Sequence, residues 1–134
     1  MRIQDIEPQD LVLLYYKLLY SGDLTGLGKI MTRSSYFITL ESFGLSLSIR
    51  NIAFKNLLEN IENDASSLDQ VEDMLSKDLI SRHLSPKIDI VSIQDNGIDR
   101  KTVNYLEDGA KKQLHFSKEN GDWKINYFAG RKTE

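Results

Sequence analysis

Three turn dipeptides recur at a strict interval in the last third of this chain. Asn96-Gly97, Asp108-Gly109 and Asn120-Gly121 each follow the one before by twelve residues. A two-residue type I′ hairpin turn needs positive φ at both central positions, which Asn, Asp and Gly tolerate best. The spacing therefore predicts a four-stranded antiparallel meander.

Side chains before the meander recur with the period of an α-helix. An amphipathic helix is expected over about 8–20, with Pro8 in its first turn and Ser21-Gly22 at its end. A second, short helix is expected over about 24–32, with Asp23 as its cap.

The middle of the chain is less regular. Between 36 and 49, apolar residues alternate with Gly and Ser, and this alternation favours an extended segment. A helix is expected from Asn51 to about Asn63, and Ser67 with Gln70 predicts a capping box that opens another helix.

The turns also predict which side chains share a face of the sheet. Two-residue loops set Asp95 opposite Ile98, so that Ile90 meets Val103 and Ile88 meets Tyr105. The later loops set Glu107 opposite Ala110 and Glu119 opposite Asp122. One face then carries a set of apolar residues that the helices are expected to cover: Ile88, Ile90, Val103, Tyr105, Leu114, Phe116, Trp123, Ile125 and Tyr127.

The opposite face is too apolar for a sheet surface in contact with water. By the same register it carries several large apolar side chains, and a two-fold partner sheet is the simplest cover for them. The predicted homodimer interface consists of Val91, Ile93, Leu106, His115 and Phe128. A bulge near Val91 would change part of this prediction.

Composition restricts the class of protein. The 134 residues suit one domain, 1–134, and the net charge of −3 argues against a nucleic-acid partner. The chain has no cysteine, no apolar run that could span a membrane and no leader-like start, so a cytoplasmic protein is expected. Two histidines without ligand spacing predict no metal site, and no cofactor motif occurs.

Two short segments resemble a known superfamily. The stretch 18–24, LLYSGDL, and the stretch 120–125, NGDWKI, are similar to a helix junction and the last strand of nuclear transport factor 2-like proteins. The resemblance implies an α+β cone in which a curved four-stranded meander wraps N-terminal helices. It also implies a pocket in the cone mouth, dimerisation through the outer sheet face and a small bacterial protein. Residues 34–49 depart from the expected pattern.

This resemblance constrains the fold more than the function. The residues expected at the pocket are Tyr15, Tyr105, Phe116, Trp123 and Tyr127. Since no carboxylate is expected on the core face, we favour a noncatalytic module that binds a small apolar ligand or a protein partner as a homodimer. The alternative is an isomerase or dehydratase type of enzyme that uses Tyr105 or Tyr127 as proton donor on a small hydrophobic substrate. A buried carboxylate or histidine in contact with a tyrosine would favour that alternative.

Overall fold

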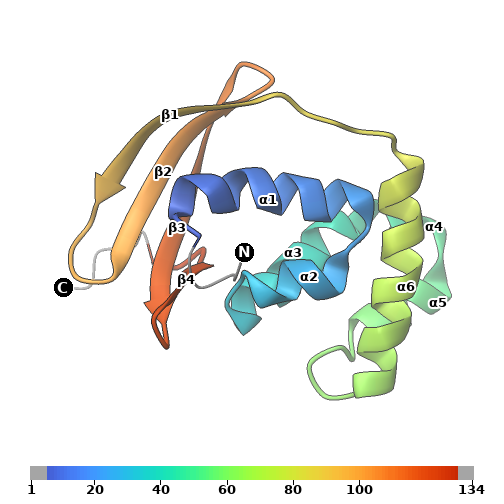
Figure 1. Cartoon of the computed structure of the whole chain (residues 1–134). Coiled ribbons are helices and arrows are strands. Elements are labelled where there is room, and N and C mark those ends of the chain that lie inside the picture. Colours follow the sequence, from blue (N-terminus) through green and yellow to red (C-terminus); the bar gives the residue numbers. More distant parts are fainter. Residues whose placement is uncertain (1–5, 130–134) are drawn as a thin grey trace.

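The helices precede the strands, and both are described here from a computed structural model that covers residues 6–129 (Figure 1). The arrangement confirms the predicted α+β class, with helices packed on an antiparallel sheet. The elements are α1 (Pro8–Ser21), α2 (Leu24–Lys29), α3 (Arg33–Phe43), α4 (Leu45–Arg50), α5 (Ile52–Leu58), α6 (Ala65–Ser81), β1 (Ile88–Asp95), β2 (Arg100–Glu107), β3 (Ala110–Glu119) and β4 (Asp122–Ile125).

The sheet is the predicted meander, with strand order β1-β2-β3-β4 and every neighbour antiparallel. The second and third hairpins have the predicted two-residue turns, because Glu107 pairs with Ala110 and Glu119 with Asp122. The turn residues all have positive φ, from 50° at Asp108 to 86° at both glycines. The local requirement of the type I′ turn therefore decided these two hairpins.

The first hairpin differs from the prediction. Asp95 pairs with Lys101 rather than with Ile98, so the connection is longer than two residues. The side chain of Asp95 accepts a hydrogen bond from the amide of Gly97, and the side chain of Asn96 donates to Thr102 Oγ1 at 2.5 Å. These side-chain bonds hold a wider loop in place of a type I′ turn.

The register of β1 on β2 shifts accordingly. Ile90 lies opposite Tyr105 and Ile88 opposite Glu107, in place of the predicted partners Val103 and Tyr105. A β-bulge interrupts the pairing between Ile90 and Ser92, at Val91, and it changes part of the predicted faces.

The bulge moves Ile93 to the other face of the sheet. Ile93 lies opposite Val103, and directly paired residues of an antiparallel sheet share a face. Because Val103 is fully buried under the helices, the prediction that Ile93 belongs to the outer face was wrong.

Residues 33–43 and 45–50 form α3 and α4, so the predicted extended segment was also wrong. Tyr36, Phe37 and Leu40 are buried along α3 at spacings of one and three to four residues. The alternating stretch falls in α4, which buries none of its residues. Its period-two pattern therefore reflects no buried face.

Side-chain caps fix several helix starts. Asp23 Oδ1 accepts from the amide of Gly26 at 2.9 Å, as predicted, although α2 ends at Lys29. Asn51 caps α5 by accepting from Phe54. Helix α6 begins at Ala65 with Asp64 as its cap, so the capping box predicted further along is not formed.

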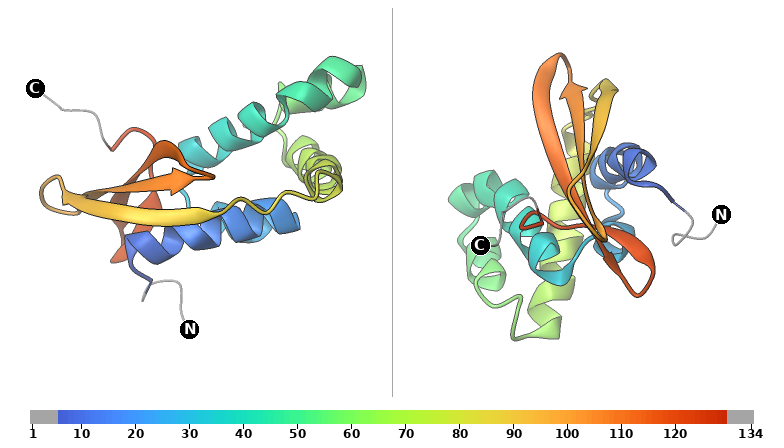
Figure 2. Two further views of the ribbon diagram at one scale, coloured as in Figure 1. Left: turned by 90° about the horizontal axis from the view of Figure 1, so that it is seen from above. Right: turned by 90° about the vertical axis from the view of Figure 1, so that its left-hand side faces the viewer.

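Helix α1 lies along one face of the sheet, and α6 crosses beyond its far end (Figures 1 and 2). The connection between α2 and α3 is tied to the sheet, because Ile125 donates to Ile30 O at 2.8 Å and accepts from Thr32 N at 2.9 Å. Helices α4 and α5 lie at the end of the molecule that is remote from the sheet (Figure 2).

Candidate functional site

Four tyrosines meet between α1 and the sheet. Tyr15 and Tyr16 are consecutive on α1, and their rings form an edge contact with centroids 4.9 Å apart. Tyr16 Oη lies 2.7 Å from Tyr105 Oη on β2, and Tyr15 Oη lies 3.5 Å from Tyr127 Oη, just after β4. Three of the five residues predicted at a pocket, Tyr15, Tyr105 and Tyr127, thus have their hydroxyl groups in this cluster.

A carboxylate joins the cluster at the end of β2. Tyr16 Oη donates to Glu107 Oε1 at 2.5 Å. Since a tyrosine hydroxyl carries one proton, Tyr105 must donate to Tyr16, and the protons run in order from Tyr105 through Tyr16 to Glu107. We call these three residues the tyrosine relay.

Glu107 contradicts the expectation that no carboxylate lies on the core face. Side chains alternate along a strand, so Val103, Tyr105 and Glu107 share one face of β2. Extending the predicted core face by two residues would have found it.

A second hydrogen-bonded chain lies on the other side of Tyr15. Tyr127 Oη lies 2.5 Å from Thr39 Oγ1, and Thr39 Oγ1 donates to the carbonyl of Ser35 at 2.9 Å. The backbone amide of Tyr127 donates to Ser35 Oγ at 3.0 Å. Sequence reasoning missed Ser35 and Thr39, because both lie on α3, whose last two turns had been predicted as extended.

Burial keeps the relay hydroxyls protonated. Loss of solvent raises the pKa of Tyr16 far above its usual range, and its hydrogen bonds to Glu107 and Tyr105 raise it further. Burial likewise raises the pKa of Tyr15, and the neighbouring Tyr127 raises it further. Burial also raises the pKa of Tyr105. These side chains therefore act as neutral hydrogen-bonding groups near neutral pH.

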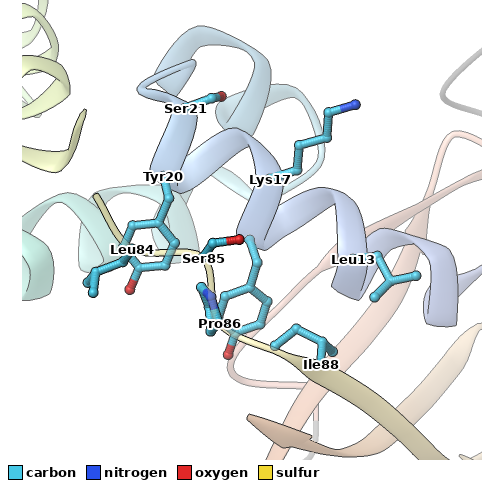
Figure 3. A pocket seen from close by; sticks show the side chains of 9 residues that line it. Leu13, Lys17, Tyr20, Ser21, Leu84, Ser85, Pro86 and Ile88 are labelled. Atoms are coloured by element: carbon cyan, nitrogen blue, oxygen red, sulfur yellow. The ribbon is translucent and has the colours of Figure 1, made fainter. Parts of the chain in front are cut away.

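An open groove of about 400 Å³ lies beside Tyr16, between α1 and residues 84–88, which lead into β1 (Figure 3). Ser85 points toward α1 from the far wall (Figure 3). Ile88, in this wall, pairs with Glu107 across the sheet. The groove lining consists of Leu13, Tyr16, Lys17, Tyr20, Ser21, Leu84, Ser85, Pro86 and Ile88. Tyr16 therefore belongs both to the groove and to the tyrosine relay.

The predicted pocket residues do not line this groove. Phe116 is fully buried, and Trp123 is buried below two lysines whose Nζ atoms lie 5.1 and 5.2 Å from its ring centroid. Tyr15 and Tyr127 lie beside the hydrogen bonds to Thr39 and Ser35. Tyr105 is connected to the groove only by its hydrogen bond with Tyr16. The groove forms because residues 84–88 lie against α1, and no local sequence pattern predicts this contact.

The outer face of the sheet is more polar than predicted. Gln113 donates to Asn104 at 2.8 Å, and Asn104 donates to Ser92 at 3.1 Å. His115 Nδ1 lies 2.8 Å from Thr102 Oγ1, and partial burial lowers the pKa of His115. Of the other predicted interface residues, Val91 and Phe128 are exposed and Leu106 is half-buried. With Ile93 on the opposite face, the outer face has lost one of its four large apolar side chains.

Other types of site find no support in the described part of the chain. Among residues 6–129, no group of three or more His, Asp or Glu side chains could hold a metal ion. Each helix in this range is too short or too polar to cross a bilayer.

Comparison with family models, with curated proteins and with solved structures found no significant match. The resemblance to nuclear transport factor 2-like proteins thus stays a prediction.

The buried tyrosines predict a cooperative alkaline transition. Tyr15, Tyr16 and Tyr36 have raised pKa values in the folded chain, whereas an unfolded tyrosine titrates near pH 10. Their contribution to stability is complete below about pH 10 and is lost as the pH rises further, because only the unfolded state then releases the protons. We expect the tyrosinate absorbance of these residues to appear together with the loss of far-ultraviolet circular dichroism.

Tyr16→Phe provides the control for this transition. The variant lacks one buried titrating group, so its stability to urea should fall less steeply above about pH 10 than that of the wild type. Gradual titration of every tyrosine near pH 10 with the helical signal intact would contradict the prediction.

Proposed function

We propose that this chain is a noncatalytic small-molecule-binding domain of the nuclear transport factor 2-like type, and that the groove between α1 and residues 84–88 is its ligand site. The observation that carries the proposal is the double position of Tyr16. Its ring lines the groove, while its hydroxyl is held by Tyr105 and Glu107. A side chain held in this way offers a ligand a preorganised surface, and preorganisation lowers the entropic cost of binding.

The groove walls suit a ligand with an apolar body. Leu13 and Leu84 are large exposed apolar residues in the groove wall, and Ile88 adds a third aliphatic side chain. The hydroxyl groups of Tyr20 and Ser85 lie among these apolar groups. A few polar groups in a mostly apolar concave surface are typical of small-molecule sites, whose volumes run from about 300 to 1,000 Å³.

The proton positions favour binding over catalysis. Oxyanion stabilisation needs a donor that points at the developing charge, but Tyr16 gives its proton to Glu107 and Tyr105 gives its proton to Tyr16. Both hydroxyl protons of the relay are thus already used in hydrogen bonds within the protein and do not point at a ligand.

A proton-transfer enzyme is the second candidate, because one observation favours it. Glu107 accepts a hydrogen bond from Tyr16 beside the groove. A substrate that replaces the Tyr16 hydroxyl in this hydrogen bond could give its proton to Glu107, which would act as a base. Under this candidate, Glu107→Gln would abolish turnover. Under the binding proposal, there is no turnover to lose.

A homodimer is not required by this proposal. Ile93, one of the expected interface residues, lies on the opposite face of the sheet. On the outer face, the polar side chains of Gln113, Asn104 and Ser92 form hydrogen bonds with one another. The groove lies within one copy of the chain.

A screen of small aromatic and aliphatic compounds by two-dimensional NMR tests the proposed site. We expect at least one compound to shift the amide signals of Leu13 and Ile88. Ser85→Trp places a bulky side chain in the groove from an exposed position and should weaken that binding at least about tenfold.

Ile98→Trp is the matched control, since Ile98 is 92% exposed near the first hairpin turn and lies outside the groove. This variant should bind as the wild type does. A screen without any binder, or a binder that Ser85→Trp leaves unaffected, would contradict the proposed site.

A further inference from the structure

Glu107 is a half-buried carboxylate without a cationic partner in the described chain. Its hydrogen bond comes from Tyr16 to Oε1, and none of the ion pairs among residues 6–129 includes it. Asp78 differs from it, since Arg50 and Arg82 contact Asp78 at 3.2 and 2.7 Å. Partial burial of a charge costs free energy, and a cation that paired with Glu107 would lower this cost.

The carboxylate lies beside the groove. Glu107 is the cross-strand partner of Ile88 and the acceptor for Tyr16, and both of these residues line the groove. Glu107 also affects Tyr20, which lines the groove. Burial raises the pKa of Tyr20, and the negative charge of Glu107 raises this pKa further. Two elements, α1 and β1, thus place groove-lining residues next to this carboxylate.

Two cations near the groove, Arg82 and Lys17, do not form an ion pair with Glu107. Arg82 uses its guanidinium on Asp78 and on the carbonyl of Phe43, at 2.7 and 2.9 Å. Lys17 lines the groove with part of its side chain, but it extends away from Tyr20 and Pro86 (Figure 3). The rings of Tyr16 and Tyr20 line this side of the groove. Glu107 is not itself a lining residue, but it lies next to Tyr16 and is in no ion pair among residues 6–129.

We propose that the groove binds an organic cation, namely an ammonium group carried on an apolar or aromatic body. This inference rests on the proposed function and specifies the class of its ligand. The ammonium would pair with Glu107 and lie against the faces of Tyr16 or Tyr20, because aromatic faces attract cations. The apolar body would pack on Leu13 and Leu84.

Three probes of similar size and different charge test the inference: 2-phenylethylammonium, 2-phenylethanol and 3-phenylpropionate. NMR titration of the full chain measures the affinity of each. We expect the ammonium to bind at least about tenfold more tightly than the alcohol, and the carboxylate to bind most weakly.

Glu107→Gln keeps the size of the side chain and its acceptor for Tyr16 but removes the charge. We expect this variant to bind the ammonium no better than the alcohol. Glu119→Gln removes a charge at the exposed end of β3, outside the groove lining, and should retain the preference. The wild-type comparison needs no variant, so a folding defect in Glu107→Gln would not remove the test.

Equal affinity for ammonium and alcohol, tightest binding of the carboxylate, or an unchanged preference in Glu107→Gln would overturn the cation inference and leave the groove proposal standing. If none of the three probes shifts the NMR signals while the wider screen finds a binder in the groove, the cation inference is also overturned. If neither the probes nor any compound of the screen binds, the proposed function itself is overturned.

Discussion

Phe116→Ala is expected to lower the free energy of unfolding by about 3–5 kcal/mol. Phe116 is fully buried and lies in the middle of β3, opposite Lys101 on β2 and Ile125 on β4. Truncation removes an entire ring from the layer between the sheet and the helices, and the surrounding strands are held by their ladders and cannot close the cavity. Urea denaturation followed by circular dichroism measures the change.

Ile98→Ala is the control for the burial argument. Ile98 is 92% exposed, so its truncation should change the unfolding free energy by less than about 0.5 kcal/mol. The denaturant slope of Phe116→Ala should match that of the wild type if both unfold in one step. A loss below about 1 kcal/mol for Phe116→Ala would show that the core is less tightly packed than the structure indicates.

Gly22→Ala is expected to cost about 2–4 kcal/mol, from backbone strain and steric overlap together. Gly22 ends α1 with φ of 79°, a conformation that L-residues with a Cβ avoid. An added Cβ would lie 2.6 Å from Ser76 Oγ and 2.8 Å from Ile80 Cδ1, both on α6. It would also disturb the hydrogen bond that Ser76 donates to the carbonyl of Gly22 at 2.8 Å.

Gly109→Ala separates the two causes. Gly109 has φ of 86°, but an added Cβ would meet nothing within 4 Å. This variant should show the backbone cost alone, about 1–2 kcal/mol. Equal losses for the two glycine variants, measured by urea denaturation, would mean that the contact between α1 and α6 contributes no steric constraint at Gly22.

The candidate site was only partly predictable from the sequence. Strand alternation placed Tyr105 on the inner face, and the same alternation carried two residues further would have included Glu107. The partner of both, Tyr16, was predicted to lie on an amphipathic helix, but no pattern indicated which strand residue it would meet. The contact spans 89 residues of chain from Tyr16 to Tyr105, and such pairing depends on how the helix packs.

Two predictions of the fold failed where a short segment had the composition of a structure that it does not adopt. The alternation across α4 matched the period of a strand, yet this helix buries none of its residues. The Asn96-Gly97 dipeptide has the composition of a type I′ turn, but side-chain bonds from Asp95 to Gly97 and from Asn96 to Thr102 hold a longer connection.

The sequence by itself determined the helix before Gly22, the cap at Asp23 and the tight turns at Asp108-Gly109 and Asn120-Gly121, because each depends on the φ preferences or side-chain bonds of a few adjacent residues. Only the tertiary structure decided the bulge at Val91, the face on which Ile93 lies, and the groove beside Tyr16. These depend on the packing of segments far apart in the chain, whose contacts no short pattern encodes.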